Sequence, residues 1–277
     1  MTIEASLVGK SKETIRQANK IIRKKKCTKT KRIHRPEISI SLQKLFIACK
    51  DMFKGPGIVP PSPDVQRLQR ILDNMEPEDF GLSSNLVFFN PRSAIKGTPS
   101  IKYTTIYQCK NFSLCIFFLP PTAVIPLHNH PEMTVFSKLL LGSMHIKSYD
   151  LVNSVTSDEL TQSSKLRLAR MKADNVFTAP CNTSVLYPTS GGNIHAFTAV
   201  TACAVLDVLG PPYSKDDGRD CTYYRDFPYS SSSNAMMAKA DGNDDASYGW
   251  LEEIDVPKEL RMDRVDYMGP QIVETNC

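Results

Sequence analysis

The sequence predicts a mainly β protein, a sandwich or barrel, preceded by a few N-terminal helices. From about residue 101 the apolar pattern has a period of two, and β-branched and aromatic residues dominate. These runs are short and separated by turn residues, as is typical of sandwiches and barrels. Upstream, residues 41–75 place apolar side chains at a period near 3.6, which is the helical signal.

Length and composition indicate a soluble globular chain. The 277 residues are 41% hydrophobic and 23% charged, enough for one substantial core or two small ones. No run approaches the ~18 apolar residues that span a bilayer, and the first residues lack the apolar core of a secretory signal. We therefore expect an intracellular protein with no membrane partner. The eight cysteines form no CxxC pair, which favours reduced thiols over a zinc ribbon or a disulfide framework.

The N-terminal 37 residues are predicted to form a basic, disordered head, and residues 38–277 a single domain. Residues 1–35 carry 12 Lys and Arg against 2 acidic residues, whereas the rest carries 22 against 27. An acidic body does not bind nucleic acid over a broad surface, so direct nucleic-acid binding is not expected there. The run at 23–26 suggests a nuclear-import tag, with a phosphate-contacting arm or a solvated helix end as alternatives. The expected location is nucleus and cytoplasm.

Two helices are predicted between Ser41 and Met75. The first has an apolar stripe made of Leu42, Leu45, Phe46 and Met52. Gly and Pro residues at 55–61 then break the pattern. Ser62 is predicted as the N-cap of the second helix, with Pro63 at its first position. The stripe of the second helix consists of Leu68, Ile71, Leu72 and Met75.

The β region contains eight strand-like runs, each bounded by turn residues. They are 101–109, 112–119, 133–140, 143–152, 166–172, 184–188, 194–200 and 202–209. The polar stretch 229–246 is predicted to be a flexible insertion. Residues 247–270 are predicted to pack back on the body.

Histidine placement suggests a metal site. Four of the five histidines fall in the strand-rich region. His128 and His130 are two residues apart, so they share one face of an extended segment. His195 follows a Pro and Gly turn and begins an apolar strand. A single such histidine would be read as a hydrogen-bonded core residue, but the three together favour a metal centre. His145 has no comparable partner and is interpreted as structural.

Imidazole ligands limit the choice of metal. They suit Zn, Cu, Fe or Ni, whereas Ca and Mg prefer clustered carboxylates. Glu132 is a rival ligand, since it would share the face of His128 and His130 if the strand continued. Pro131 disfavours a regular strand at that point.

Taken together, these motifs resemble the cupin barrel. The carboxylate usual in cupins, three or four residues beyond HxH, is replaced by Thr134 or Val135. The chain is thereby similar to the thiol dioxygenases, cupins that hold iron on three histidines. Segments 126–150, 191–214 and 221–228 most resemble the plant cysteine oxidases. The likeness covers about residues 40–255 and implies a cupin-type double-stranded β-helix, a jelly-roll barrel.

The resemblance also assigns roles to residues. It implies one Fe(II) per chain, held by His128, His130 and His195. Asp207 and Tyr213 match polar residues that line the substrate pocket, and Cys221 and Tyr223 match a Cys-x-Tyr near its mouth. For these last two, ordinary packing is the alternative. Two positions depart from the family pattern: Glu132, where Gly is frequent, and Leu151, where Trp is common.

Asp207 also stands out without the resemblance. A carboxylate inside the apolar run 202–209 is costly to bury without a partner. Twelve residues of continuous strand would hold it ~40 Å from His195, at ~3.3 Å per residue. We therefore predict a hairpin, centred near Thr201, that places residue 195 opposite 207. Cys181 and Cys203 are predicted to be packed.

The implied activity is oxidation by O2 of the N-terminal cysteine of proteins to cysteine sulfinic acid. The implied substrates are group VII ethylene-response transcription factors, which this reaction marks for N-degron degradation, so the enzyme would act as an oxygen sensor and is expected to be a monomer. Three alternatives remain open: a dioxygenase of free cysteine or another small thiol, a non-catalytic cupin with a DNA-contacting head, and a zinc-bound or metal-free barrel.

Overall fold

The computed structural model describes residues 39–83, 86, 100–152, 166–229 and 248–274. All of them belong to the unit Pro36–Cys277. The predicted basic head and nearly all of the predicted insertion at 229–246 lie outside the described residues, so both stay predictions. Among the described helices, none combines the length and the apolar character that crossing a membrane requires.

The two predicted helices are confirmed. They are α1 (Ile40–Met52) and α2 (Ser62–Asp73), followed by a 3-10 turn η1 (Pro77–Phe80). Ser39 caps α1, because its hydroxyl accepts the N–H of Leu42 at 3.2 Å. The predicted cap of α2 is wrong by one residue. Pro61 is the N-cap, since its carbonyl already accepts the first helical N–H groups, and Ser62 is the first helical residue.

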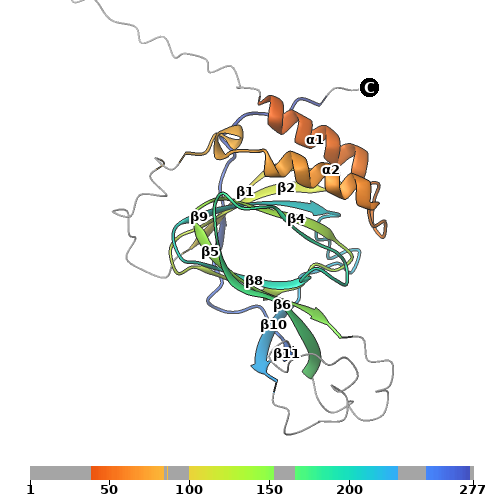
Figure 1. The fold of residues 1–277 in the computed structure, drawn as a ribbon, viewed down its shortest axis with the longest axis vertical. Coiled ribbons are helices and arrows are strands. Elements are labelled where there is room, and N and C mark those ends of the chain that lie inside the picture. Colours follow the sequence, from red (N-terminus) through yellow and green to blue (C-terminus); the bar gives the residue numbers. More distant parts are fainter. Residues whose placement is uncertain (1–38, 84–85, 87–99, 153–165, 230–247, 275–277) are drawn as a thin grey trace, which may run out of the picture. The chain divides into compact units, whose positions relative to one another are not determined.

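The described residues form twelve strands in two six-stranded sheets. Figure 1 shows the two sheets facing each other. One sheet has the order β12-β1-β2-β9-β4-β7, and the other closes into a barrel in the order β10-β11-β6-β5-β8-β3. The strands of the first sheet are β1 (Ile101–Gln108), β2 (Ser113–Leu119), β4 (Thr134–Leu141), β7 (Ser184–Leu186), β9 (Cys203–Gly210) and β12 (Met262–Arg264). Those of the second are β3 (Val124–His128), β5 (Ser143–Leu151), β6 (Leu166–Thr178), β8 (Ile194–Ala199), β10 (Tyr223–Pro228) and β11 (Tyr248–Ile254).

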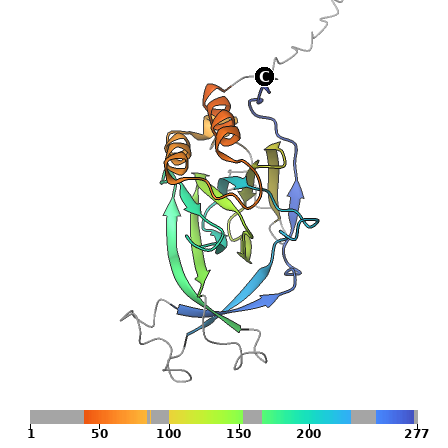
Figure 2. The ribbon, with the colours of Figure 1, turned by 90° about the vertical axis from the view of Figure 1, so that its right-hand side faces the viewer.

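The order of the strands gives the jelly roll. From β2 to β5, and again from β6 to β10, successive strands alternate between the two sheets. That alternation is the double-stranded β-helix, so the predicted cupin-type fold is confirmed. All eight predicted runs form strands. The C-terminal segment also packs back as predicted, because β11 joins β6 and β10, and β12 joins β1 (Figure 2).

The chain reverses between β8 and β9, as predicted, but it does not form a hairpin there. β8 pairs with β3 and β5, whereas β9 pairs with β2 and β4 in the other sheet. The reversal is therefore a crossover between sheets, whose strands face each other across the interior. The turn needs neither Gly nor Pro, because Ser143 secures it: its carbonyl accepts the N–H groups of Val200 and Thr201 at 2.9 and 3.1 Å.

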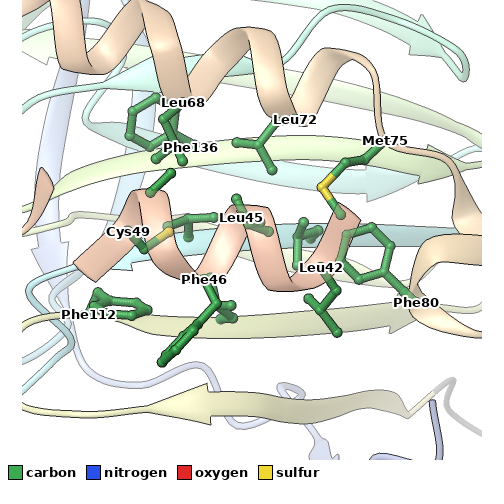
Figure 3. Packing of buried hydrophobic residues seen from close by; sticks show 14 of the residues in the cluster. Leu42, Leu45, Phe46, Cys49, Leu68, Leu72, Met75, Phe80, Phe112 and Phe136 are labelled. Carbon is green, nitrogen blue, oxygen red and sulfur yellow. The ribbon is translucent and has the colours of Figure 1, made fainter. Parts of the chain in front are cut away.

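The helices cover the outer face of the first sheet (Figure 1). Apolar side chains of both helices pack against alternate residues of the central strands. Figure 3 shows Leu45 and Phe46 of α1, Leu68 of α2 and Phe136 of β4 in this cluster. The opposite face of this sheet packs on the barrel sheet through a second cluster, to which Val205 and Phe197 belong. The interior between the sheets is where the histidines converge.

Helix α2 also holds the loop between β6 and β7. The Thr183 N–H donates to Asp73 Oδ1 at 2.7 Å, and Gln69 Nε2 donates to the Thr183 carbonyl at 2.8 Å. The buried Lys138 ammonium donates to the Cys181 carbonyl at 2.7 Å and lies 4.0 Å from Asp73 Oδ1. The carboxylate of Asp73 thus supports both a buried N–H and a buried charge.

We expect Asp73→Ala to lower the free energy of unfolding by about 2 kcal/mol, since it leaves the Thr183 N–H unpaired and removes the carboxylate that lies 4.0 Å from the Lys138 ammonium. Urea unfolding measures this change. Asp73→Asn keeps an acceptor but no charge, so its loss should be smaller. Equal stability of Asp73→Ala and the wild type would contradict the assignment.

Candidate metal centre

The three predicted histidine ligands converge in the interior. His128 ends β3, and the β3–β8 pairing sets it directly opposite His195 of β8. His130 follows two residues later, in the loop before β4. One ring nitrogen from each histidine lies within 4.8 Å of the others, and the Nε2 atoms of His130 and His195 are 3.2 Å apart. Three imidazoles from two segments of the chain thus face one point.

Hydrogen bonds to the outer ring nitrogens fix two of the tautomers. Nδ1 of His128 lies 2.8 Å from the Pro126 carbonyl, so this nitrogen carries the proton. The Tyr213 hydroxyl donates its proton to the Asn129 carbonyl at 2.8 Å, so at 2.9 Å it can only accept one from Nδ1 of His130. Nε2 of both rings therefore presents a lone pair to the interior.

The electrostatics favour a cation at this point. Burial lowers the pKa of all three imidazoles, and for His130 and His195 the pKa falls well below its ordinary value. The rings are therefore neutral, and Nε2 of His128 and of His130 presents a lone pair to the interior, where Nε2 of His195 also lies. A divalent transition metal accepts such lone pairs. The residues present fit a metal ion.

Glu132 does not join the site. The strand ends at His128, and Glu132 lies in the following turn with a φ of 57° and an exposed side chain. The group of possible ligands among the described residues contains the three histidines alone. The alternative of two histidines and Glu132 is therefore wrong, because the chain turns at Pro131 as its ring predicts.

Glu132 carries a backbone cost instead. A left-handed φ costs a non-glycine residue about 1 kcal/mol. We expect Glu132→Gly to raise the free energy of unfolding by up to about 1 kcal/mol, offset in part by the extra freedom of glycine in the unfolded chain. Thermal unfolding and a metal titration check this together. Unchanged metal affinity is expected, and a destabilised variant would contradict the argument.

Asp207 lies in β9 beside the site. In the sheet register it stands between Cys115 of β2 and Ser137 of β4. Asp207 is 5% exposed, and Oδ1 of its carboxyl has no hydrogen-bond partner among the described residues. Burial raises the pKa of this carboxyl to about 7, which a hydrogen bond from Ser137 only partly offsets. Burial raises the pKa of Tyr213 well above its ordinary value, and the charges of Cys221 and Asp207 add to this shift, so Asp207 and Tyr213 are in electrostatic contact.

Cys221 and Tyr223 gather on the same side of the histidines. Tyr223 begins β10 and pairs with His128, with ring centroids 6.3 Å apart. The Cys221 thiol hydrogen-bonds the hydroxyls of Tyr223 and Tyr213, and burial raises its pKa to about 11. The structure thus brings Tyr213, Cys221 and Tyr223 together beside the metal ligands, with Cys221 as a neutral thiol.

A cavity of about 230 Å³ opens beside His195, between the two sheets. Most of its wall is apolar and includes Leu139, Ile146, Phe197 and Val205. Ser137 also lines it, whereas Asp207 and Tyr213 do not. The expectation that these two line the pocket is thus not met for this cavity. Asp207 is linked to the wall of this cavity by Ser137, whose side chain hydrogen-bonds its carboxyl.

Two further predictions concern His145 and a pair of cysteines. His145 faces outward and pairs with Asp174 at 2.7 Å, in agreement with a structural role. Cys203 is fully buried, and its thiol donates to the Ser143 carbonyl at 3.1 Å. Cys181 is only half-buried and lines the cavity, so for this residue the prediction of packing holds in part.

Comparisons with known proteins agree with this geometry. The PCO_ADO family model matches residues 71–272. The chain belongs to the PCO_ADO family. Plant cysteine oxidase 2 of Arabidopsis thaliana is 51% identical over 84% of this chain and 83% of its own length. Plant cysteine oxidase 1 of the same plant is 48% identical over 87% of this chain and 84% of its own length. The 2-aminoethanethiol dioxygenase of Mus musculus is 29% identical over 57% and 66%.

Membership of PCO_ADO makes this chain a thiol dioxygenase, and its three convergent histidines could hold a metal ion. Among solved structures, an RmlC-like cupin protein from Desulfovibrio desulfuricans is 19% identical over 47% of this chain and 97% of that chain, with a TM-score of 0.29. The fold assignment stands on the strand order described above.

Sequence reasoning missed two residues of this PCO_ADO site. Asn193 hydrogen-bonds the main chain of His130, and Asp150 hydrogen-bonds the turn that carries Asn193. In the sequence, Asn193 follows a pair of glycines, and an asparagine in that position cannot be distinguished from an ordinary turn residue.

Proposed function

We propose that this thiol dioxygenase holds one Fe(II) on His128, His130 and His195 and oxidises the N-terminal cysteine of proteins. The observation that carries the proposal is the convergence of three neutral, buried imidazoles without a carboxylate, in a chain half identical to plant cysteine oxidases. Fe(II) bound there supplies a Lewis-acidic redox centre for a thiol and dioxygen. Both atoms of one O2 end on the sulfur, so RSH and O2 give RSO2H and no co-substrate is consumed.

The chain's own residues prepare this reaction. Neutral ligands add no negative charge, so a substrate thiol can give up its proton close to the cation. The largely apolar wall of the cavity beside His195 offers few groups that bind water. The unpartnered oxygen of Asp207 suits an α-ammonium group, because a charge-assisted hydrogen bond would offset the cost of burying the carboxylate. We place substrate recognition there, with Tyr213 orienting His130 and with Cys221 and Tyr223 beside the ligands.

The wider role is also part of the proposal. The substrates are group VII ethylene-response transcription factors, and sulfinic acid at their N-terminus starts N-degron degradation. Since turnover then depends on oxygen supply, the enzyme acts as an oxygen sensor. The names of the two Arabidopsis relatives support a cysteine substrate. We place the enzyme in nucleus and cytoplasm, with the basic head as an import signal, and expect it to act as a monomer.

Mass spectrometry of a peptide with a free N-terminal cysteine tests the reaction. Protein loaded anaerobically with Fe(II) and then given O2 should add two oxygen atoms to that cysteine. The same peptide with an acetylated N-terminus is the matched control and should stay unmodified, because it lacks the ammonium group. Equal oxidation of both peptides would contradict recognition of the N-terminus, and protein loaded with zinc should be inactive.

A small-thiol substrate is a second candidate, because the cavity measures only about 230 Å³. A mouse relative is named for 2-aminoethanethiol, which carries an amine and a thiol like an N-terminal cysteine. Competition between free cysteine and the peptide separates the candidates. Preference for free cysteine would favour the small-thiol activity. The non-catalytic cupin loses its support, since the family is one of thiol dioxygenases.

A further inference from the structure

Asn193 joins the two segments that carry the metal ligands. It is 7% exposed and lies two residues before His195. Its Oδ1 accepts the N–H of His130 at 3.1 Å, and its Nδ2 donates to the His130 carbonyl at 2.9 Å and to the Tyr187 carbonyl at 2.8 Å. The side-chain amide thus grips both polar groups of the His130 main chain, as a paired strand would. His130 itself pairs with none of the described strands.

Asp150, at the end of β5, holds the turn that carries Asn193. Its carboxylate accepts three successive main-chain N–H groups, from Gly191 at 3.0 Å, Gly192 at 2.8 Å and Asn193 at 3.0 Å. Gly192 has a φ of +83°, and a Cβ there would lie 2.7 Å from the Ser148 hydroxyl. The turn therefore has one tight conformation, which the carboxylate secures.

We propose that Asn193 is a positioning residue of the metal centre, clamping the main chain of His130 to the turn that leads into His195. Asp150 acts one step further out, by holding that turn. The clamp sets the separation of two ligands that are 65 residues apart in the sequence before any metal binds. Its action differs from that of Tyr213, which contacts the His130 ring. The inference requires a metal at the three histidines, but neither iron nor a particular substrate.

A cobalt titration of the full-length, metal-free protein tests the clamp. Co(II) is stable in air, and its visible absorption reports ligand geometry, so no turnover is needed. Asn193→Ala should weaken Co(II) affinity by about 10- to 100-fold, the range found when supporting partners of metal ligands are removed. Its absorption band should also change, because His130 can then move relative to His195.

Two variants make the outcome decisive. Val65→Ala truncates a buried side chain of α2 in the helical core and is the stability control. It should lower the melting temperature and keep wild-type Co(II) affinity. Asp150→Asn should weaken Co(II) binding less than Asn193→Ala, and the double variant should be no weaker than Asn193→Ala alone, because both act through one turn.

Wild-type affinity and absorption in Asn193→Ala would overturn the proposal, as would an equal affinity loss in Val65→Ala. If Asn193→Ala does not fold, Asp150→Asn decides the question: weaker binding with an altered band supports the clamp, and wild-type binding overturns it. Failure of the proposed function would give a different result: the wild type would bind Co(II) normally, but the iron-loaded enzyme would leave the cysteine peptide unmodified.

Discussion

His195→Ala is expected to lose bound iron and to lower turnover of an N-terminal cysteine peptide by more than about 10³-fold. His195 supplies one of three convergent imidazoles and also forms part of the cavity wall. Two remaining histidines cannot hold a metal firmly in a site without a described carboxylate ligand. Metal analysis and peptide mass spectrometry measure both losses on the same sample.

The matched control is His145→Ala. His145 belongs to the same sheet but faces outward, with Asp174 as its partner. The control should retain both metal and turnover, so any general effect of removing a histidine cancels. Full iron content in His195→Ala, or comparable losses in both variants, would contradict the three-histidine centre.

Asp207→Asn is expected to raise KM for the peptide by about 10- to 100-fold, with a smaller effect on metal content. A hydrogen bond between charged groups contributes about 1.5–3 kcal/mol, and the neutral amide cannot supply it to an α-ammonium. Steady-state kinetics with free and acetylated peptides measures the loss. An unchanged KM would show that the buried carboxyl of Asp207 does not recognise the substrate amine.

The same substitution should change how stability depends on pH. The folded-state pKa of Asp207 is raised from 3.8 to about 7, so between these values the folded protein binds more protons than the unfolded chain. The contribution of the Asp207 carboxyl to the free energy of unfolding is fully present below about pH 4 and is lost as the pH rises through about 7. The free energy of unfolding of Asp207→Asn, relative to that of the wild type, should therefore rise by on the order of 4 kcal/mol between pH 4 and pH 8.

Urea unfolding of the metal-free proteins at the two pH values tests the linkage. Asp255→Asn, at an exposed position, is the control and should show no such gain. If the gain is absent in Asp207→Asn as well, the carboxyl is ionised at little cost in the folded protein. Oδ1 of Asp207 would then have a hydrogen-bond donor outside the described contacts.

Local patterns in the sequence predicted the elements well. The apolar stripes of the helices and the alternation of the eight strand runs depend on neighbouring residues, and so does the shared face of His128 and His130. Pairing between distant strands was not readable in the same way. The turn at Thr201 was predicted from the need to bring His195 near Asp207, but only the full set of partners shows that β8 and β9 lie in different sheets.

The residues that refine the site were hidden for the same reason. Asn193 matters through a hydrogen bond to His130, 63 residues earlier, and nothing near it in the sequence announces that partner. The three residues of β12 show no alternation, and β12 exists because β1 offers a free edge. Asp207 could be found, because a charge within an apolar strand conflicts with its own neighbours.

The hydrogen bonds from α2 to the Thr183 loop limit how far the N-terminus of this enzyme can be truncated. The family match begins at residue 71, yet Gln69, which holds the Thr183 carbonyl, precedes it. Cys181 and Ser184, on either side of Thr183, form part of the cavity wall. A fragment that starts at β1 would expose the outer face of the first sheet and release that rim. We therefore expect an active fragment to require both helices, because α1 and α2 cover this face and α2 holds the loop.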